Sequence, residues 1–192
     1  MAYVRVFSSC LTGLLLAVGV AAAAPLQDLG DSTFDPSTGL VWLDLTATAD
    51  LSYDDVTRLL SGFPPYAGYR YASVAEVQTL FSDAGITSAS GPWENAAELS
   101  GLLGQTVFPG PGSFGSIGLT GDRDPRNPSR IYYMMLIGDR AETFAGVGGS
   151  VFTFFVRPEF AGSFLVRDAR GPLLFDRVAL LDAAAAPDAA LD

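Results

Sequence analysis

The stretch FDPSTGLVWLDLT, residues 34–46, decides how the fold begins. Residues 35–39 carry a turn signature, with proline in the second position and glycine at the end. The apolar run over 39–44 then predicts a strand that this turn feeds. Trp42 is the largest side chain of that run, and we expect it to lie in the core.

Two helices are predicted after this strand. The first begins at Ser52, whose side chain caps the free amides, and ends before Gly62. The second begins with the capping box Ser73–Glu76 and ends at Gly85, which supplies a left-handed stop. Between them, residues 68–72 are aromatic and too few for a helix, so they predict a strand.

The composition changes after the second helix. The stretch 85–128 is rich in Gly, Ser and Pro and predicts long irregular loops, with room for a short helix at 94–103. Several strand-like runs follow, and turns at 138–139 and 148–149 make them an antiparallel meander. These runs are residues 131–137, 151–157, 164–167 and 173–181.

This order of elements predicts the α+β class, because no helices separate the later strands as a parallel sheet would require. We expect one domain over 24–181, since a chain of about 170 residues can bury a sufficient core without disulfides. Residues 182–192 are acidic and rich in alanine and predict a disordered tail.

Residues 1–23 predict a secretory signal peptide. Arg5 precedes an apolar stretch, and Ala21 and Ala23 provide the small side chains that a signal peptidase needs, so the cut is expected after Ala23. That stretch is shorter than the about 20 residues that span a membrane as a helix. We therefore expect a secreted protein, extracellular or periplasmic, without a membrane span in its mature form.

The composition excludes several classes of chemistry. The 192 residues include no histidine, the single cysteine Cys10, and 11 basic residues that are all arginine. A Ser-His-Asp triad, a Cys-His pair and an HExxH zinc site all need residues that the mature chain lacks. The formal charge of -10 opposes binding to nucleic acid or anionic lipid. We expect no enzymatic activity, no cofactor and no metal site.

The segments FDPSTGLVWLDLT and GYRYASVAEVQTLFSDAGI, with the closing GSFLVRDA, resemble exported bacterial proteins that often carry PEP-CTERM sorting tails. Those proteins are similar to the Lcl C-terminal family, in which TGLMW, WRLPT-x-x-EL and a terminal VR recur. The resemblance covers about residues 34–86 and, more weakly, 160–169. It implies a C-type-lectin-like fold, with two helices against antiparallel sheets, long irregular loops and a last strand beside the first.

The resemblance assigns a structural role to each matching position, and no catalytic residue. These positions are Gly39, Leu40, Trp42, Tyr69, Arg70, Ser73, Glu76, Val166 and Arg167. We expect Arg70 and Arg167 to form structural ion pairs with carboxylates. The calcium-ligating signatures Glu-Pro-Asn and Trp-Asn-Asp and the lectin disulfides do not occur, so calcium-dependent sugar binding is not implied. A sorting tail is not recognisable after Leu181, which fits a soluble exported product.

Aromatic side chains in or beside the long loops are the candidate ligand-binding residues, because stacking platforms for sugars or peptides are built from them. The candidates are Trp93, Tyr132 and Tyr133, with Phe108 and Phe114 beside them. The competing interpretation is core filling, which we expect for Phe152, Phe154 and Phe155.

Acidic residues offer two further hypotheses. Asp122, Asp124 and Asn127 form a D-x-D-x-x-N cluster that Ca²⁺ would tolerate. A solvated polar turn is the favoured explanation, because Arg123 and Arg126 cancel the charge and the spacing does not continue into a 12-residue calcium loop. A glycoside hydrolase would need two facing carboxylates. The candidates for such a pair are Glu94, Glu98, Glu142 and Glu159.

The leading hypothesis is a secreted, non-enzymatic lectin-like module that binds an extracellular polymer or protein at the cell surface or in the matrix. The alternatives are a glycoside hydrolase that uses two carboxylates and a structural coat protein. A lectin-like oxidase of the formylglycine-generating type is excluded, because its chemistry uses cysteines that the mature chain lacks.

Overall fold

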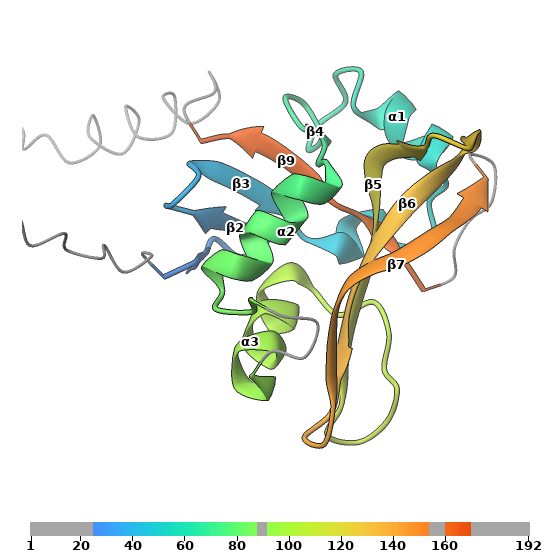
Figure 1. Cartoon of the computed structure of the whole chain (residues 1–192). Coiled ribbons are helices and arrows are strands. Elements are labelled where there is room, and N and C mark those ends of the chain that lie inside the picture. Colours follow the sequence, from blue (N-terminus) through green and yellow to red (C-terminus); the bar gives the residue numbers. More distant parts are fainter. Residues whose placement is uncertain (1–24, 88–91, 154–159, 170–192) are drawn as a thin grey trace, which may run out of the picture.

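The computed structural model describes residues 25–87, 92–153 and 160–169 (Figure 1). The described chain forms three α-helices, one 3-10 helix and two sheets, which confirms the α+β class. Several predicted segments lie outside it, namely the signal peptide at 1–23, most of the strand at 151–157, the strand at 173–181 and the tail at 182–192.

The first sheet contains the strand that the opening turn feeds. Its order is β1-β2-β3-β9-β4, and all neighbouring strands are antiparallel. The strands are β1 (Gln27–Asp28), β2 (Ser32–Asp35), β3 (Leu40–Leu43), β4 (Arg70–Tyr71) and β9 (Leu165–Asp168). Gly39 closes the turn before β3 with a φ of 73°, a left-handed conformation that glycine adopts without a steric penalty. The closing strand β9 pairs with β3 along its whole length.

The helices begin at the predicted caps. Ser52 and Ser73 each accept a hydrogen bond from the backbone three residues later, and the acidic residue there bonds back to the cap, so both helices have complete capping boxes. A third helix occupies the short segment expected inside the Gly-rich stretch. The helices are η1 (Leu45–Thr48), α1 (Tyr53–Leu59), α2 (Val74–Asp83) and α3 (Trp93–Leu103).

The second sheet, with the order β7-β6-β5-β8, departs most from the sequence predictions. Its strands are β5 (Phe114–Asp124), β6 (Asn127–Gly138), β7 (Thr143–Thr153) and β8 (Gly162–Ser163). The irregular loops predicted over 85–128 are wrong from residue 114 onward, because β5 and the start of β6 form a hairpin there. Asp124 lies opposite Asn127 and leaves only Pro125 and Arg126 between the strands.

Glycines in this sheet make room for neighbouring side chains, and this is why the sequence suggested loops. A Cβ atom on Gly115 would lie 3.0 Å from Val107. The predicted turn at 148–149 is also wrong, since both glycines lie inside β7. Gly148 is the extra residue of a bulge opposite β6, and a Cβ there would lie 2.0 Å from the Tyr133 ring.

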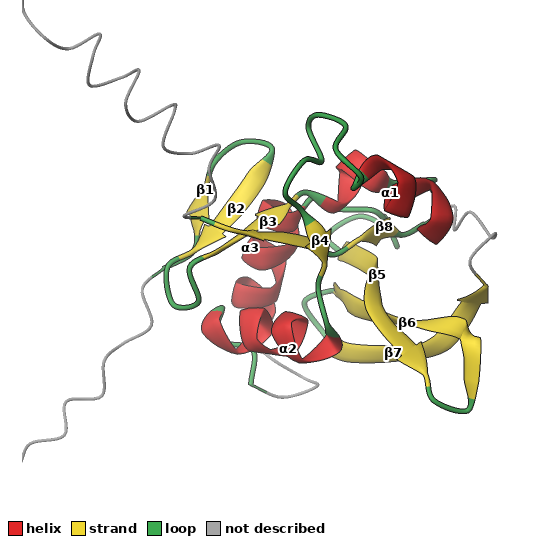
Figure 2. Ribbon diagram, turned by 90° about the horizontal axis from the view of Figure 1, so that it is seen from above, coloured by secondary structure: helices red, strands yellow, loops and turns green. Residues whose placement is uncertain are grey.

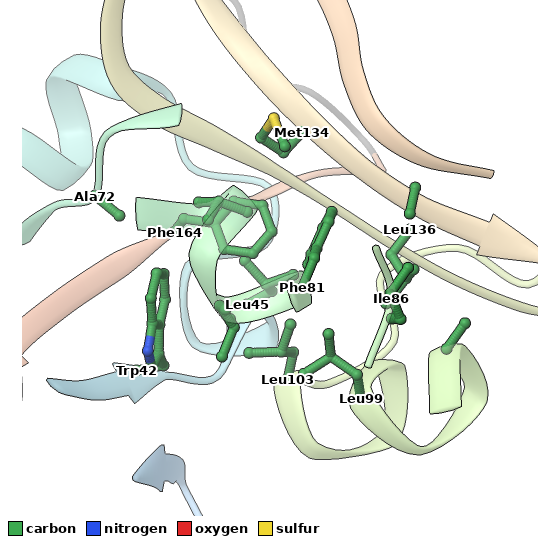
Figure 3. Packing of buried hydrophobic residues seen from close by; sticks show 14 of the residues in the cluster. Trp42, Leu45, Ala72, Phe81, Ile86, Leu99, Leu103, Met134, Leu136 and Phe164 are labelled. Carbon is green, nitrogen blue, oxygen red and sulfur yellow. The ribbon is translucent and has the colours of Figure 1, made fainter. Parts of the chain in front are cut away.

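Helices α2 and α3 pack in the angle between the two sheets, and α1 covers the other face of the first sheet (Figure 2). The main core, drawn in Figure 3, joins Trp42 of β3 with residues of both helices and of the second sheet. Trp42 is only 1% exposed, which confirms its predicted burial. Within the described chain, no helix is long and apolar enough to cross a membrane.

The two sheets meet at residues 162–164. β8 runs parallel to β5, and the chain then passes directly into β9 of the first sheet. The Phe164 amide donates to the Leu119 carbonyl of β5 at 2.8 Å, and its carbonyl accepts from the Ala72 amide beside β4 at 2.8 Å. The Phe164 ring meets Trp42 edge to face, with 6.3 Å between ring centroids. Phe164 therefore connects the two sheets through its backbone hydrogen bonds and through the packing of its ring in the core.

This junction predicts that Gly162 tolerates no side chain. A Cβ on Gly162 would lie 2.1 Å from the carbonyl oxygen of Leu45, and backbone cannot move aside as a side chain does. Gly162→Ala is expected to lower the free energy of unfolding by about 3 kcal/mol or to prevent folding. Denaturant titration followed by circular dichroism measures this change.

Gly101→Ala provides the control, because nothing lies within 4 Å of a Cβ at this exposed position of α3. It is expected to raise stability by about 0.5–1 kcal/mol through helix propensity. Equal effects of the two substitutions would contradict the tight approach at the junction.

Candidate functional site

Trp93 begins α3 and lies half-buried against the core. Its ring centroid is 6.5 Å from that of Phe114 and 5.5 Å from the guanidinium carbon of Arg140. Its indole Nε1 is buried and has no hydrogen-bond partner among the described residues. Phe114, which the sequence placed in a loop, is 2% exposed in β5. The Trp93 ring is therefore occupied by protein contacts in this structure.

Tyr132 and Tyr133 are half-buried in the middle of β6. The ring of Tyr133 lies over Gly148, and the Tyr132 carbonyl accepts a hydrogen bond from the Thr120 hydroxyl. Phe114, beside Trp93, is five positions along β5 from Leu119, which pairs with Tyr133. At about 3.4 Å per residue this separation is roughly 17 Å, so the three predicted aromatics do not form one site.

The residues of the family motifs hold the first sheet and its helices together. Arg70 pairs with Glu76 at 2.6 and 2.9 Å, which confirms the ion pair predicted for Arg70. No carboxylate pairs with Arg167 among the described residues, so its predicted ion pair stays a prediction. Its guanidinium carbon instead lies 5.1 Å from the Tyr69 ring centroid, where the π-face of the ring attracts the cation.

The acidic residues of the proposed calcium cluster accept hydrogen bonds from nearby backbone. Asp122 accepts from the amide of Val74 at the start of α2, and Asp124 accepts from the amide of Arg126 at 2.8 Å. Asn127 accepts from both the amide and the hydroxyl of Ser129. Among the described residues, no three acidic side chains gather closely enough to hold a metal ion.

The glutamates proposed for hydrolysis do not face one another across a cleft in the described structure. Glu94 and Glu98 are exposed one turn apart on α3, where neighbouring side chains lie on a convex surface. Glu142 lies in the exposed turn between β6 and β7. Glu159 falls outside the described residues.

Two aspartates have a raised pKa. At the end of β3, burial and then the charges of Asp28 and Asp31 raise the pKa of Asp44 from 3.8 to about 6. One carboxylate oxygen of Asp44 is buried, and no described residue forms a hydrogen bond with it. At the end of α2, burial and then the neighbouring Asp35 raise the pKa of Asp83. Both aspartates therefore make the folded state less stable when they ionise.

The second sheet has an apolar face that points away from α2 and α3. Its alternate residues Phe114, Ser116, Met134, Leu136 and Ala145 are buried on the helix side. The residues between them form the outer face, because successive side chains of a strand point to opposite sides. This outer face consists of Gly115, Ile117, Met135, Ile137, Phe144 and Gly146, which pair across β5, β6 and β7.

A hollow of about 250 Å³ opens at one end of this outer face, and we call it the Phe144 hollow. It is lined by Pro109, Ser113, Ile137, Gly138, Asp139, Glu142 and Phe144. Phe144 is 40% exposed, and Phe108, which precedes the wall residue Pro109, is 77% exposed. Phe108, which the sequence placed in a loop, is therefore exposed and lies next to the wall of the Phe144 hollow.

The loop that walls the hollow is fastened to β5. The amides of Thr106 and Val107 both donate to the Gly115 carbonyl, at 2.9 and 3.1 Å. The Ile117 amide donates to the Thr106 hydroxyl at 3.0 Å. The loop therefore runs beside the β6–β7 hairpin as a held segment (Figure 1).

The rim of the hollow is acidic. One oxygen of Asp139 accepts from the amides of Ala141 and Glu142 at 2.8 and 3.0 Å, and these bonds lower the pKa of Asp139. The Glu142 carboxylate has no hydrogen bond or ion pair within the described chain. The one cation of the turn, Arg140, lies over Trp93. Two negative charges are thus left beside an apolar floor.

Sequence reasoning missed Phe144 as a site residue. The sequence predicts turns at 138–139 and at 148–149, and therefore no strand between them. Phe144 lies in that interval, in β7. The detectable signal was the alternation in TFAGV that continues the alternation of Met135 and Ile137 on β6.

A larger hollow of about 710 Å³ lies at the turn between β2 and β3. It is lined by Phe34, Pro36, Ser37, Thr38, Gly39, Asp168 and Ala169. Of these side chains, Ser37 and Thr38 belong to the turn, where Asp35 accepts hydrogen bonds from the Ser37 amide and the Thr38 hydroxyl.

The raised pKa of Asp44 predicts a stability that falls as the pH rises from about 4 to about 6, because the folded protein binds the proton more tightly than the unfolded chain. Asp44→Asn is expected to be more stable than the parent at about pH 7, by about 1 kcal/mol after allowance for solvent screening, and equal to it below about pH 4. Urea unfolding at both pH values measures the difference. A comparable gain in Glu98→Gln, which removes an exposed charge from α3, would contradict a specific role of Asp44.

The lowered pKa of Glu76 predicts the opposite dependence. The hydrogen bond from Arg70 is the main cause, and burial opposes it, which leaves a value of about 2. The stabilisation is present above about pH 4.5 and is lost as the pH falls towards about 2. Glu76→Gln is expected to lose about 1–2 kcal/mol at about pH 7, from the screened ion pair and the weakened capping box, and little near pH 2. A pH-independent loss would contradict the ionic contribution.

The chain was compared with protein-family models, with curated proteins and with solved structures, and no significant match was found. The likeness to PEP-CTERM-associated and Lcl C-terminal proteins therefore stays a prediction from the motifs. The structure establishes the α+β architecture and the geometry of the outer face.

Proposed function

We propose that this protein is a secreted, non-enzymatic binding module with a C-type-lectin-like fold, and that the outer face with the Phe144 hollow is its ligand-binding surface. The observation that carries the proposal is the exposure of Phe108 and Phe144 beside a walled hollow. The ligand class is an extracellular polymer or protein.

The arrangement of the first sheet supports the lectin-like part of the proposal. After the opening strand β3, the chain forms a helix, a strand and a second helix, and its closing strand β9 returns to pair with β3. That order is the one implied by the motif resemblance. It differs in having a third helix, α3, and a regular hairpin where long loops were expected.

The energetics of the outer face support a binding role. The exposed parts of Phe108 and Phe144 would contribute roughly 5 kcal/mol if a partner covered them, before the entropic cost of association. Contiguous exposed apolar surface of this kind marks interaction sites more often than chance exposure does. The fastened loop keeps this surface in place before a ligand arrives.

The edge of the second sheet favours one alternative, a structural coat protein. β7 is the outermost strand of this sheet in the described chain, and no charged residue occurs over Thr143–Thr153. Uncharged edge strands pair readily with other chains. Ordered assemblies on sizing columns at micromolar concentration, without any ligand, would favour this alternative, whereas a monomer would favour the binding module.

Substitution of the exposed phenylalanines tests the proposed surface. Phe144→Ala and Phe108→Ala are each expected to weaken ligand binding about tenfold or more, because each removes about 2 kcal/mol of covered apolar surface. Binding is measured against a glycan array and a displayed peptide library, with thermal unfolding as a check on folding.

Phe63→Ala is the matched control, because Phe63 is 61% exposed in the segment between α1 and β4, away from the second sheet. It is expected to leave binding unchanged. Equal binding by all three variants, or no binding by the parent protein to either set of probes, would overturn the proposal.

A further inference from the structure

We propose that the Phe144 hollow binds an extended segment of another protein in which an apolar side chain lies next to an arginine or lysine. This inference rests on the proposed function and names the ligand class of the same surface. The apolar side chain would occupy the floor of the hollow, and the basic group would meet the carboxylates of Asp139 and Glu142.

The size of the hollow suits one side chain. Its volume of about 250 Å³ lies below the about 300–1,000 Å³ of pockets that enclose a small-molecule ligand. Phe144 and Ile137 pair across β6 and β7 and form an apolar floor. A leucine or phenylalanine side chain fills such a space and removes both surfaces from water.

The negative charge of the rim favours an arginine or lysine next to the apolar side chain of the bound segment. Asp139 stays ionised because two backbone amides bond to it, and the Glu142 carboxylate is unpartnered within the described chain. Arg140 contacts Trp93 and is not placed to neutralise both acids. The formal charge of -10 on the whole chain also draws cationic partners from a distance. A cation beside the apolar anchor is therefore complementary to the hollow.

The hydrogen-bonding groups favour a peptide over a sugar. The Ser113 hydroxyl already donates to the Gly110 carbonyl at 2.5 Å. The other polar side chains of the lining, Asp139 and Glu142, are carboxylates, which accept hydrogen bonds and donate none. A sugar ring presents both donors and acceptors, and buried acceptors without a donor lose free energy. An arginine or lysine presents donors alone, which match these carboxylates.

The test uses the full-length protein and a panel of fluorescent ten-residue peptides. One set contains a central phenylalanine or leucine flanked by arginine or lysine, a second set has glutamate flanks, and a third has serine in place of the apolar residue. Anisotropy is measured at low and at physiological salt. The basic, apolar set is expected to bind, and added salt is expected to weaken this binding.

Two variants connect binding to the hollow. Glu142→Gln is expected to weaken binding of the basic peptides about two- to fivefold and to reduce its salt dependence, as removal of one exposed charge pair does. Glu98→Gln removes the same charge from α3 and is expected to have less effect. Phe144→Ala is expected to weaken binding about tenfold or more.

The outcomes separate this inference from the proposed function. Equal binding of acidic and basic peptides, or equal effects of the two glutamate substitutions, would overturn the peptide assignment. Glycan binding that depends on Phe144, in the absence of peptide binding, would also overturn it and would leave the binding module standing. If no probe binds in a Phe144-dependent way, both proposals fail.

Discussion

The architecture depends on the close approach of residues 162–164 to η1 and β5. Gly162 lies against the carbonyl of Leu45, and the Phe164 ring fills the space above Gly118, where a Cβ would be 2.6 Å from the ring. Any side chain at either glycine would separate the sheets. Because Phe164 also bonds to both sheets through its backbone, the junction fixes their relative position.

The angle that the junction creates explains where the helices and the candidate surface lie. α2 and α3 fill the inside of the angle and bury one face of the second sheet. Among the described residues, the loop before β5 covers part of the opposite face, where Val107 lies over Gly115, and Phe144 stays 40% exposed. Exposed Phe144 and the hollow beside it therefore follow from a sheet whose two faces are packed unequally. The proposed binding surface is the face of the second sheet that carries the exposed Phe144 side chain.

Arg70 and Arg167 of the first sheet make internal contacts, and two acidic side chains line the Phe144 hollow at the second sheet. Arg70 forms an ion pair with Glu76 of the α2 capping box, and Arg167 lies over the Tyr69 ring. In the turn after β6, the Arg140 guanidinium lies over Trp93. Within the described chain, no cation forms an ion pair with Asp139 or Glu142. At the Phe144 hollow, the charged side chains that face a partner are therefore carboxylates. The absence of histidine and lysine from the sequence thus bears on the ligand as well as on the chemistry.

The sequence by itself determined the turn at 35–39, the strand after it, both capping boxes and the α+β class, because each depends on contacts between residues close along the chain. It also indicated Trp42 as core, since a tryptophan in an apolar strand is best buried there. Only the tertiary structure decided that the Gly-rich stretch 85–128 contains β5, and that Gly148 and Gly149 lie inside β7. Glycine can be required for a turn conformation or because a neighbouring side chain leaves no room for a Cβ atom, and the sequence does not distinguish the two cases. Gly148 is of the second kind, because the Tyr133 ring occupies the place of its Cβ. The Phe144 hollow forms where the loop before β5 lies beside the β6–β7 hairpin, so it became visible only in the folded chain.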